Sequence, residues 1–292
     1  MNKRCIVCDS RVADPMYPGI VKCRDCSYVY ADLDMTQDEF EKLYNSGYFK
    51  GEEYSDYLTD KIIHQKNFNS RLDVLKKYLD PGRHKSLLEV GCAYGFFLEL
   101  AKKEFNHVVG VDVTAEGVEY AQNQLNLNAY KADLLNWDFD HQQFDVVCLW
   151  DTIEHLRAPD KYLEKISENI SSGGLLTITT GDIDSRMARW RKNRWRLIHP
   201  PTHAHYFSRV SLTRLLDRYD FDVVHFEHCN FHRSMDNIAY NILTLRSNYS
   251  WLYRLLKKSR ILNWDLSANM FDIMYVIAVS YTHLRAHETR GN

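Results

Sequence analysis

A glycine-containing turn between an apolar segment and a helical segment constrains the fold of this chain most. The segment reads Leu87-Leu-Glu-Val-Gly-Cys-Ala-Tyr-Gly-Phe-Phe-Leu98, with Gly91 and Gly95 at the two ends of the turn. Glycine permits a tight turn and lets a ligand approach the backbone closely. The next apolar segment ends at Asp112, 21 residues after Gly91, where a carboxylate can accept hydrogen bonds from both ribose hydroxyls. The pattern predicts a strand–turn–helix unit that holds a nucleoside.

An acidic residue just before the turn restricts the class of ligand that can bind there. The dinucleotide fingerprint G-x-G-x-x-G is not met, and Glu89 stands just before the first glycine. A carboxylate at this place repels a pyrophosphate and attracts a cationic amino-acid group. A ligand with a cationic amino-acid end would therefore be favoured at this place.

Short β-branched segments alternate with helical segments over most of the chain. We expect strands at 86–90, 108–112, 146–150, 175–180, 221–226 and 273–280, and helices near 60–79, 96–104, 115–125, 161–170 and 238–262. Strand–helix alternation with apolar strands predicts an α/β fold around a parallel, doubly wound sheet.

Four cysteines near the N-terminus form two C-x2-C pairs separated by fourteen residues: Cys5, Cys8, Cys23 and Cys26. Four thiolates suit tetrahedral Zn²⁺, and a rubredoxin-type iron site uses the same ligands. Because all four positions are taken by protein ligands, we expect a closed, structural metal site. The remaining three cysteines are scattered singly, which argues against a disulfide framework.

The chain divides into four predicted parts. These are a metal-binding ribbon (1–30), a tyrosine-rich connector and helix that could act as a lid (31–80), the main domain (81–280), and a tail that is non-native or disordered (281–292). A net charge of −2 argues against general nucleic-acid binding, and the sequence contains neither a signal segment nor a membrane span. We therefore expect a cytoplasmic protein; its oligomeric state is not predicted.

The motifs of the main domain, taken in order, resemble those of the class I S-adenosylmethionine-dependent methyltransferases. The sequence shows E-x-G-x-x-x-G, V-G-V-D ending at Asp112, A-D-L-L around Asp133, F-D-V-V-C-L-W ending at Trp150 and followed by D-T-I-E-H, and S-G-G-L-L-T-I-T. The resemblance implies a Rossmann-like, seven-stranded sheet whose last strand is antiparallel. It also implies that S-adenosylmethionine is the cofactor.

In that family the glycine turn cradles the methionine and ribose parts of the cofactor, and acids after the second and third strands bind the ribose and the adenine. Mapped onto this chain, the resemblance implies a cofactor site formed by Glu89, Gly91, Cys92, Gly95, Asp112, Val113, Asp133, Leu134, Trp150 and Asp151.

Three histidines are candidates for the base that takes a proton from the acceptor. His155 follows the fourth expected strand, and His203 and His205 follow the fifth. A structural role for each remains an alternative. The D-T-I-E-H loop also resembles metal loops of some quinone-precursor and RNA 2′-O-methyltransferases. Mg²⁺ or another divalent ion held by Asp151, Glu154, His155 and a distant histidine is therefore a further alternative.

A cationic segment, residues 186–196, carries two tryptophans and is either a site for a phosphate-bearing or stacked-base substrate or a solvated lid. The order of ribbon and methyltransferase domain resembles a subgroup that modifies sugars and small metabolites. We therefore expect methyl transfer to a small hydroxylated acceptor, a sugar or glycan precursor. The alternatives are a divalent-metal-assisted O-methyltransferase on RNA or a phenolic ring, and a non-catalytic cofactor-binding protein whose ribbon docks on a partner.

Overall fold

Seven strands form the central sheet of a computed structural model that describes residues 4–33, 35, 39, 43, 57–259, 261, 262 and 264–281. Their spatial order is β10-β13-β8-β7-β4-β5-β6. The strands are β4 (Ser86–Val90), β5 (His107–Asp112), β6 (Ala129–Lys131), β7 (Phe144–Trp150), β8 (Ile170–Gly181), β10 (Phe221–His228) and β13 (Ile273–Ser280).

The direction of the strands confirms the expected fold class. Strands β4 to β8 run parallel, whereas β13 pairs antiparallel with β8 on one side and with β10 on the other. The order reverses between β4 and β7, because the chain moves outward from β4 to β5 and β6 and then returns to β7. In open α/β sheets a crevice for ligands forms at such a reversal, outside the carboxyl ends of the strands.

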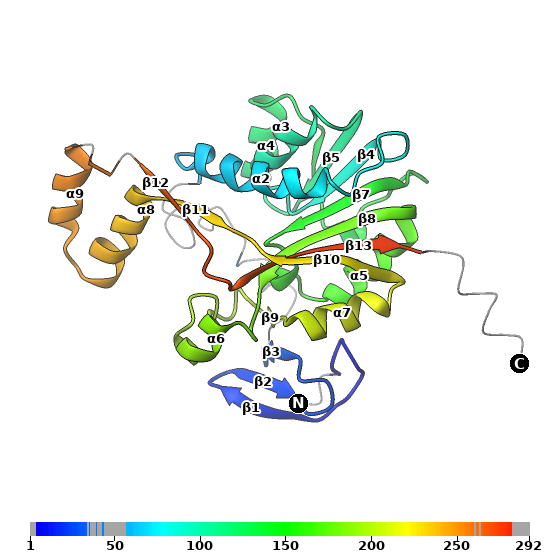
Figure 1. Cartoon of the computed structure of the whole chain (residues 1–292), viewed down its shortest axis with the longest axis horizontal. Helices are drawn as coiled ribbons and strands as arrows, with labels where there is room; N and C mark the ends of the chain where they lie inside the picture. Colours follow the sequence, from blue (N-terminus) through cyan, green and yellow to red (C-terminus); the bar gives the residue numbers. More distant parts are fainter. Residues whose placement is uncertain are drawn as a thin grey trace, which may run out of the picture.

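Helices cover both faces of this sheet (Figure 1). One face carries α2 (Lys61–Leu75), α3 (Phe96–Ala101) and α4 (Ala115–Asn123), whose apolar residues Leu72, Phe97 and Val118 belong to one buried cluster. The other face carries α5 (Pro159–Asn169) and α7 (Arg209–Asp217), with Leu163 and Leu215 fully buried. Burial of apolar area on both faces explains why the strands are almost continuously apolar.

The N-terminal cysteine segment folds as a separate small sheet, β1-β2-β3-β9. Its strands are β1 (Ala13–Tyr17), β2 (Ile20–Cys23), β3 (Val29–Ala31) and β9 (His205–Tyr206). The fourth strand comes from the main domain, with Val29 opposite Tyr206. Residues Cys5, Val7 and Tyr28 also share a buried cluster with the α7 face of the main domain.

An arm, residues 229–272, connects β10 to β13. It contains β11 (Phe231–Ser234), α8 (Met235–Tyr240), a π-helix (Asn241–Arg246), α9 (Ser250–Lys258) and β12 (Asp265–Ala268). The prediction of one helical stretch over 238–262 was wrong in its continuity. Asn248 has φ +54°, which ends helical geometry before α9 begins.

The other elements are short. They are α6 (Arg186–Arg191) and the 3₁₀ helices η2 (Leu134–Asn136), η3 (Ile153–His155) and η4 (Lys192–Arg194). The strand expected at 175–180 begins earlier, so the two glycines of the S-G-G-L-L-T-I-T segment lie inside β8, where Gly173 has φ +71°.

Two predicted segments fall largely outside the described residues: the tyrosine-rich stretch, of which only Tyr57 is described, and the tail beyond Tyr281. Within the described ranges no helix has the length and hydrophobicity needed to cross a membrane.

Candidate active site

The glycine turn after β4 has the geometry that its sequence predicts. Gly91 has φ +77°, and a Cβ atom there would lie 2.7 Å from Oγ1 of Thr152. Gly95 has φ +73° and precedes α3, and a Cβ atom there would lie 2.8 Å from the side chain of Leu127. Gly91 therefore brings the backbone close to the next loop of the site, and Gly95 allows α3 to pack.

Asp112 at the end of β5 holds this turn in place. Its Oδ2 accepts a hydrogen bond from the backbone N–H of Ala93 at 2.8 Å. Its Oδ1 accepts two more from Thr114, from the backbone N–H at 2.8 Å and from the hydroxyl at 2.6 Å. Burial raises the pKa of this carboxyl, against the effect of these hydrogen bonds.

A cavity of about 800 Å³ opens at the carboxyl ends of β4, β5 and β7. This size is typical of a small-molecule site. Of the predicted site residues, those that line it are Gly91, Asp112, Val113, Asp133, Leu134, Trp150, Asp151 and His155. Glu89, Cys92, Gly95, His203 and His205 are not among the lining residues.

Asp133 lines the cavity, and the resemblance assigns it a contact to adenine. Its Oδ1 accepts hydrogen bonds from the backbone N–H of Leu135 at 2.9 Å and from the hydroxyl of Tyr162 at 2.6 Å. Within the described chain no hydrogen bond to its Oδ2 is found, so that oxygen can accept one from a ligand's amino group.

Glu89 is buried in β4, one residue before the cavity wall begins at Val90. Burial and the nearby carboxylate of Asp112 raise its pKa well above the usual value, and Arg71 acts in the opposite sense. Its Oε2 has no hydrogen-bond partner among the described residues. A buried acceptor of this kind fits a cationic donor, which agrees with the amino-acid end of S-adenosylmethionine.

Arg71 of α2 is a site residue that the sequence analysis missed. Its side chain is 4% exposed and donates to Oδ2 of Asp151 at 2.7 Å. The guanidinium also lies 5.6 Å from the ring centre of Trp150, and all three residues line the cavity. The sequence contained a signal, because in a helix Arg71 shares a face with Phe68, three residues earlier, and Leu75, four residues later.

The three candidate histidines do not form one group. His155 lines the cavity, and its ring centre lies 4.5 Å from that of His203, which in turn lies 3.8 Å from His199. His205 lies apart, with its Nδ1 hydrogen-bonded to the hydroxyl of Tyr28 in the ribbon. His205 therefore connects two parts of the chain.

Glu154, His155 and His203 bring one ligand atom each within 4.8 Å of one another. The Nδ1–H of His155 donates to the carbonyl oxygen of Thr202 at 3.0 Å, and that of His203 donates to Leu197 at 2.9 Å. This tautomer places each lone pair on Nε2, as in histidines that bind metals. Asp151 is not part of this cluster, because its carboxylate contacts Arg71 and Thr179.

The four N-terminal cysteines converge. Their Sγ atoms all lie within 4.8 Å of one another, with Cys5 3.5 Å from Cys26 and Cys8 3.5 Å from Cys23. None of the four forms a disulfide. Four thiols gathered around one point fit a tetrahedral metal ion better than they fit unrelated cysteines.

The cationic segment lies outside the cavity, and its two tryptophans differ. Trp190 is 73% exposed, whereas Trp195 is 2% exposed and donates its Nε1–H to Asp272 at 2.9 Å. Arg196 contacts the same carboxylate at 3.0 Å. Part of this segment is therefore a structural attachment to the start of β13.

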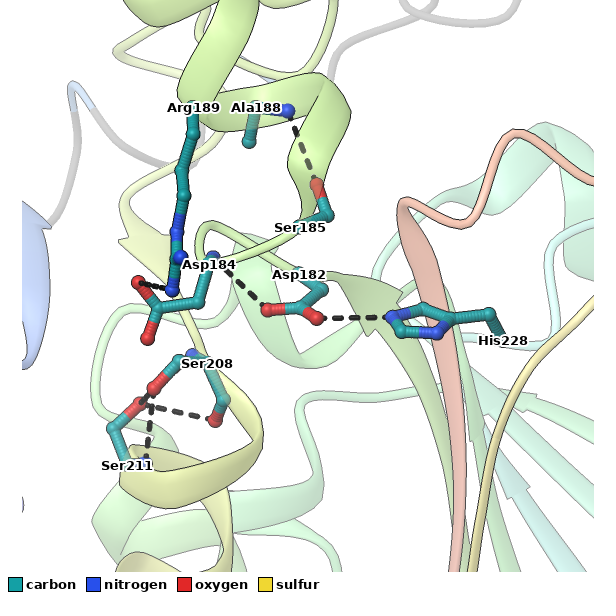
Figure 2. Close-up of polar contacts among 8 residues, drawn as sticks. All are labelled: Asp182, Asp184, Ser185, Ala188, Arg189, Ser208, Ser211 and His228. Carbon is teal, nitrogen blue, oxygen red and sulfur yellow. Dashed lines mark hydrogen bonds and ion pairs between the residues drawn. The ribbon is translucent and has the colours of Figure 1, made fainter.

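A further polar pair lies where β8 and β10 end (Figure 2). The Nε2 of His228 lies 2.9 Å from Oδ2 of Asp182, whose Oδ1 accepts the backbone N–H of Asp184 at 3.0 Å. Neighbouring serines cap two helices. Ser185 caps α6 by accepting the N–H of Ala188, and Ser208 and Ser211 form the capping box at the start of α7. Sequence reasoning missed this pair because its members are 46 residues apart.

The strand order, the antiparallel β13 and the cavity at the switch point define the class I methyltransferase fold. The family model for the methyltransferase domain matches residues 62–226, more than half of the chain, and the chain belongs to this family. The structure of magnesium protoporphyrin IX methyltransferase from Synechocystis PCC 6803, with bound SAH, covers 84% of this chain and all of its own, with a TM-score of 0.54 at 14% identity. At that identity the likeness shows the fold alone.

Curated relatives match a shorter part of the chain. A ubiquinone biosynthesis O-methyltransferase from Coxiella burnetii is 31% identical over 101 residues, which is 33% of this chain and 43% of the relative. A carboxy-S-adenosyl-L-methionine synthase from Nautilia profundicola is 25% identical over 134 residues, 43% of this chain and 56% of the relative. The chain thus spans less than two thirds of the length of either relative.

Proposed function

We propose that this chain is an S-adenosylmethionine-dependent methyltransferase that acts on a small hydroxylated acceptor, a sugar or glycan precursor. One observation carries the proposal. Gly91, Asp112, Asp133, Asp151 and His155 all line one cavity. The family match and the methyltransferase relatives support the use of S-adenosylmethionine. The cavity lining supports the small hydroxylated acceptor.

The cofactor supplies an electrophilic methyl group on a sulfonium. In the proposed complex Asp112 accepts the ribose hydroxyls, Asp133 accepts from the adenine amino group, and Glu89 faces the amino-acid end. Arg71 holds Asp151 and packs on Trp150, which fixes the wall between cofactor and acceptor.

The acceptor occupies the part of the cavity formed by α2 and β11. Tyr57, His64, Asn67, Phe68 and Phe231 line it there. Aromatic faces beside polar groups suit a ring that presents both C–H and O–H bonds.

His155 is the proposed base. Burial and the nearby His199 lower the pKa of this histidine to about 4, so its imidazole is neutral near pH 7. With its proton on Nδ1, Nε2 can accept the proton that leaves the acceptor hydroxyl.

Two measurements on the full chain test the proposal. Titration calorimetry should detect binding of S-adenosylhomocysteine to folded protein, and S-adenosylhomocysteine should be released when S-adenosylmethionine is incubated with a glycan-precursor extract. His155→Gln should lower kcat by roughly 100-fold or more and leave the Kd for S-adenosylhomocysteine unchanged. Folded protein that binds no S-adenosylhomocysteine contradicts the proposal; binding without turnover on glycan, RNA or phenolic acceptors supports the non-catalytic alternative.

A metal-assisted O-methyltransferase is the second candidate, favoured by the cluster of Glu154, His155 and His203. Two imidazoles and one carboxylate suit Zn²⁺, Mn²⁺ or Fe²⁺ better than Mg²⁺, which prefers oxygen ligands. Metal analysis distinguishes the two candidates. The second candidate requires one equivalent of metal that His203→Ala removes while the cysteine cluster keeps its own, and it requires activity to fall with that loss.

A further inference from the structure

The arm between β10 and β13 presents an apolar surface with nothing packed on it in the described structure. Figure 1 shows α8 and α9 reaching away from the central sheet, joined to it by β11 and β12. More than half of the exposed large apolar side chains described in the chain lie on this arm: Ile242, Tyr249, Trp251, Leu255, Ile261, Trp264, Leu266, Met270 and Phe271. An exposed concentration of this kind marks an interaction surface.

Helix α9 has an inner and an outer face. Tyr253 points inward, where its hydroxyl lies 3.1 Å from Oδ1 of Asp236 and its ring lies 5.3 Å from that of Tyr240. On the outer side Trp251 is 64% exposed and Leu255 is 60% exposed, and α9 has no buried residue. The outer side chains therefore gain nothing from packing within the chain.

Cations share the outer face with these apolar side chains. Arg254 and Lys258 are exposed and lie three and seven residues after Trp251, which places them on the same side of the helix. Neither has an ion-pair partner among the described residues. Long cationic side chains beside a tryptophan and a leucine suit a surface that is anionic outside and apolar beneath.

The whole arm is positively charged, as the outer face of α9 is. It contains six arginines and lysines against three aspartates, in a chain of net charge −2. All three aspartates are engaged: Asp236 with Lys257 at 3.1 Å, Asp265 with Lys66 at 2.5 Å, and Asp272 with Arg196 at 3.0 Å. The arm therefore has a formal net charge of +3, and Arg254 and Lys258 place positive charge beside its exposed indole and aliphatic groups.

We propose that the outer face of α9 binds the surface of an anionic phospholipid bilayer. Trp251 and Leu255 enter the headgroup boundary, and Arg254 and Lys258 contact lipid phosphates. Pairing with a second copy through this face would bring like charges together. A protein partner is also disfavoured, because the centres of protein interfaces are depleted in lysine.

Vesicle flotation of the full chain tests the proposal. The protein should float with vesicles of phosphatidylcholine and phosphatidylglycerol, much less with phosphatidylcholine alone, and less as salt is raised. Trp251→Ala with Leu255→Ala should reduce the bound fraction at least tenfold with no change in Tm, because neither side chain is buried. Arg254→Glu with Lys258→Glu should abolish the preference for anionic vesicles.

Trp190→Ala is the matched control, because Trp190 is also an exposed tryptophan among arginines but lies on α6. It should bind vesicles as the unchanged protein does. Three results overturn the proposal: no flotation of folded protein with anionic vesicles, equal flotation of the α9 double variant, or an equal loss in Trp190→Ala. A molecular mass that rises with concentration and falls in the double variant, without flotation, assigns this face to a second copy instead.

Discussion

Single carboxylates divide into two groups by their position in the sheet. Asp112 lies at the carboxyl end of β5, lines the cavity and accepts a hydrogen bond from the backbone of the glycine turn. Asp145 lies near the opposite end of β7, where its Oδ2 accepts hydrogen bonds from the backbone N–H groups of Lys85 and Ser86 at 2.9 and 3.0 Å. Both side chains hold backbone N–H groups, but only Asp112 faces the cavity.

This difference gives a paired prediction. Asp112→Asn should raise the Kd for S-adenosylhomocysteine at least tenfold, about 1.4 kcal/mol, because a charged acceptor for the ribose becomes neutral. Asp145→Asn should lower the free energy of unfolding by about 1 kcal/mol and leave that Kd unchanged. Calorimetry and urea unfolding of the two variants measure both effects; equal losses of affinity would mean that Asp112 acts only through folding.

His64 predicts how stability depends on pH. Burial, and then the charge of Arg71, lower the pKa of His64 to about 4, below the usual value near 6.5. The unfolded state therefore binds a proton more readily between these values. The contribution of neutral His64 is fully present above about pH 6.5 and is lost as the pH falls toward 4.

Replacing His64 with glutamine should reduce the loss of unfolding free energy at acidic pH. Between pH 7 and pH 4.5 the variant should lose about 1–2 kcal/mol less of its unfolding free energy than the unchanged chain does. Urea unfolding at the two pH values measures this, with His141→Gln on an exposed histidine as the control. Identical losses in all three proteins would contradict the assignment.

Among the elements, the ribbon depends most on something other than apolar packing. Its strands are three to five residues long, and three of its four clustered cysteines are buried. So small a unit buries little apolar area, and a bound metal would supply much of its folding free energy.

We expect about one zinc or iron per chain at the cysteine cluster, measured by elemental analysis. Cys5→Ser should lose this metal and unfold with a Tm lower by roughly 10 °C, corresponding to about 3 kcal/mol or more. Cys229→Ser should keep the metal, because Cys229 lies outside the cluster. Full metal content in Cys5→Ser, or no metal in the unchanged protein, would contradict the assignment of a metal site to these cysteines.

At the scale of the whole molecule, α2 connects the cavity to the arm. Asn67 lines the cavity and donates to the carbonyl oxygen of His232 in β11 at 3.1 Å, while its own Oδ1 accepts the N–H of His232 at 2.6 Å. These two hydrogen bonds make α2 and β11 a single wall.

Ligand binding should therefore protect both elements together. On addition of S-adenosylhomocysteine, hydrogen exchange should slow at least several-fold in α2 and in β11, and remain unchanged in the β1–β2 hairpin. In Asn67→Ala the protection should persist in α2 and disappear from β11. Protection confined to β4 and β5 would show that α2 does not close over the cavity.

Which features could be predicted from the sequence depends on how far apart in the chain the interacting residues are. The bounds of β4 and β13 were predicted, and those of β5 to within one residue, because each depends on a local pattern. Gly91, Asp112 and Asp133 lie at the cavity for the same reason. The pairing of β9 with β3, the Asp182–His228 pair and the Arg71–Asp151 contact were not, since their members are tens to nearly two hundred residues apart. The four-part division of the chain and the roles of the site residues stay predictions.

The strand shared between the ribbon and the main domain limits how this chain can be cut or recombined. Removing residues 1–60 to isolate the main domain would uncover the edge of β9 and the apolar patch beneath Tyr28, and would take away the hydrogen-bond partner of His205. Such a truncation invites aggregation through the exposed edge. For the same reason, a ribbon from another protein should replace this one without loss of stability only if the sequence of β9 is exchanged with it.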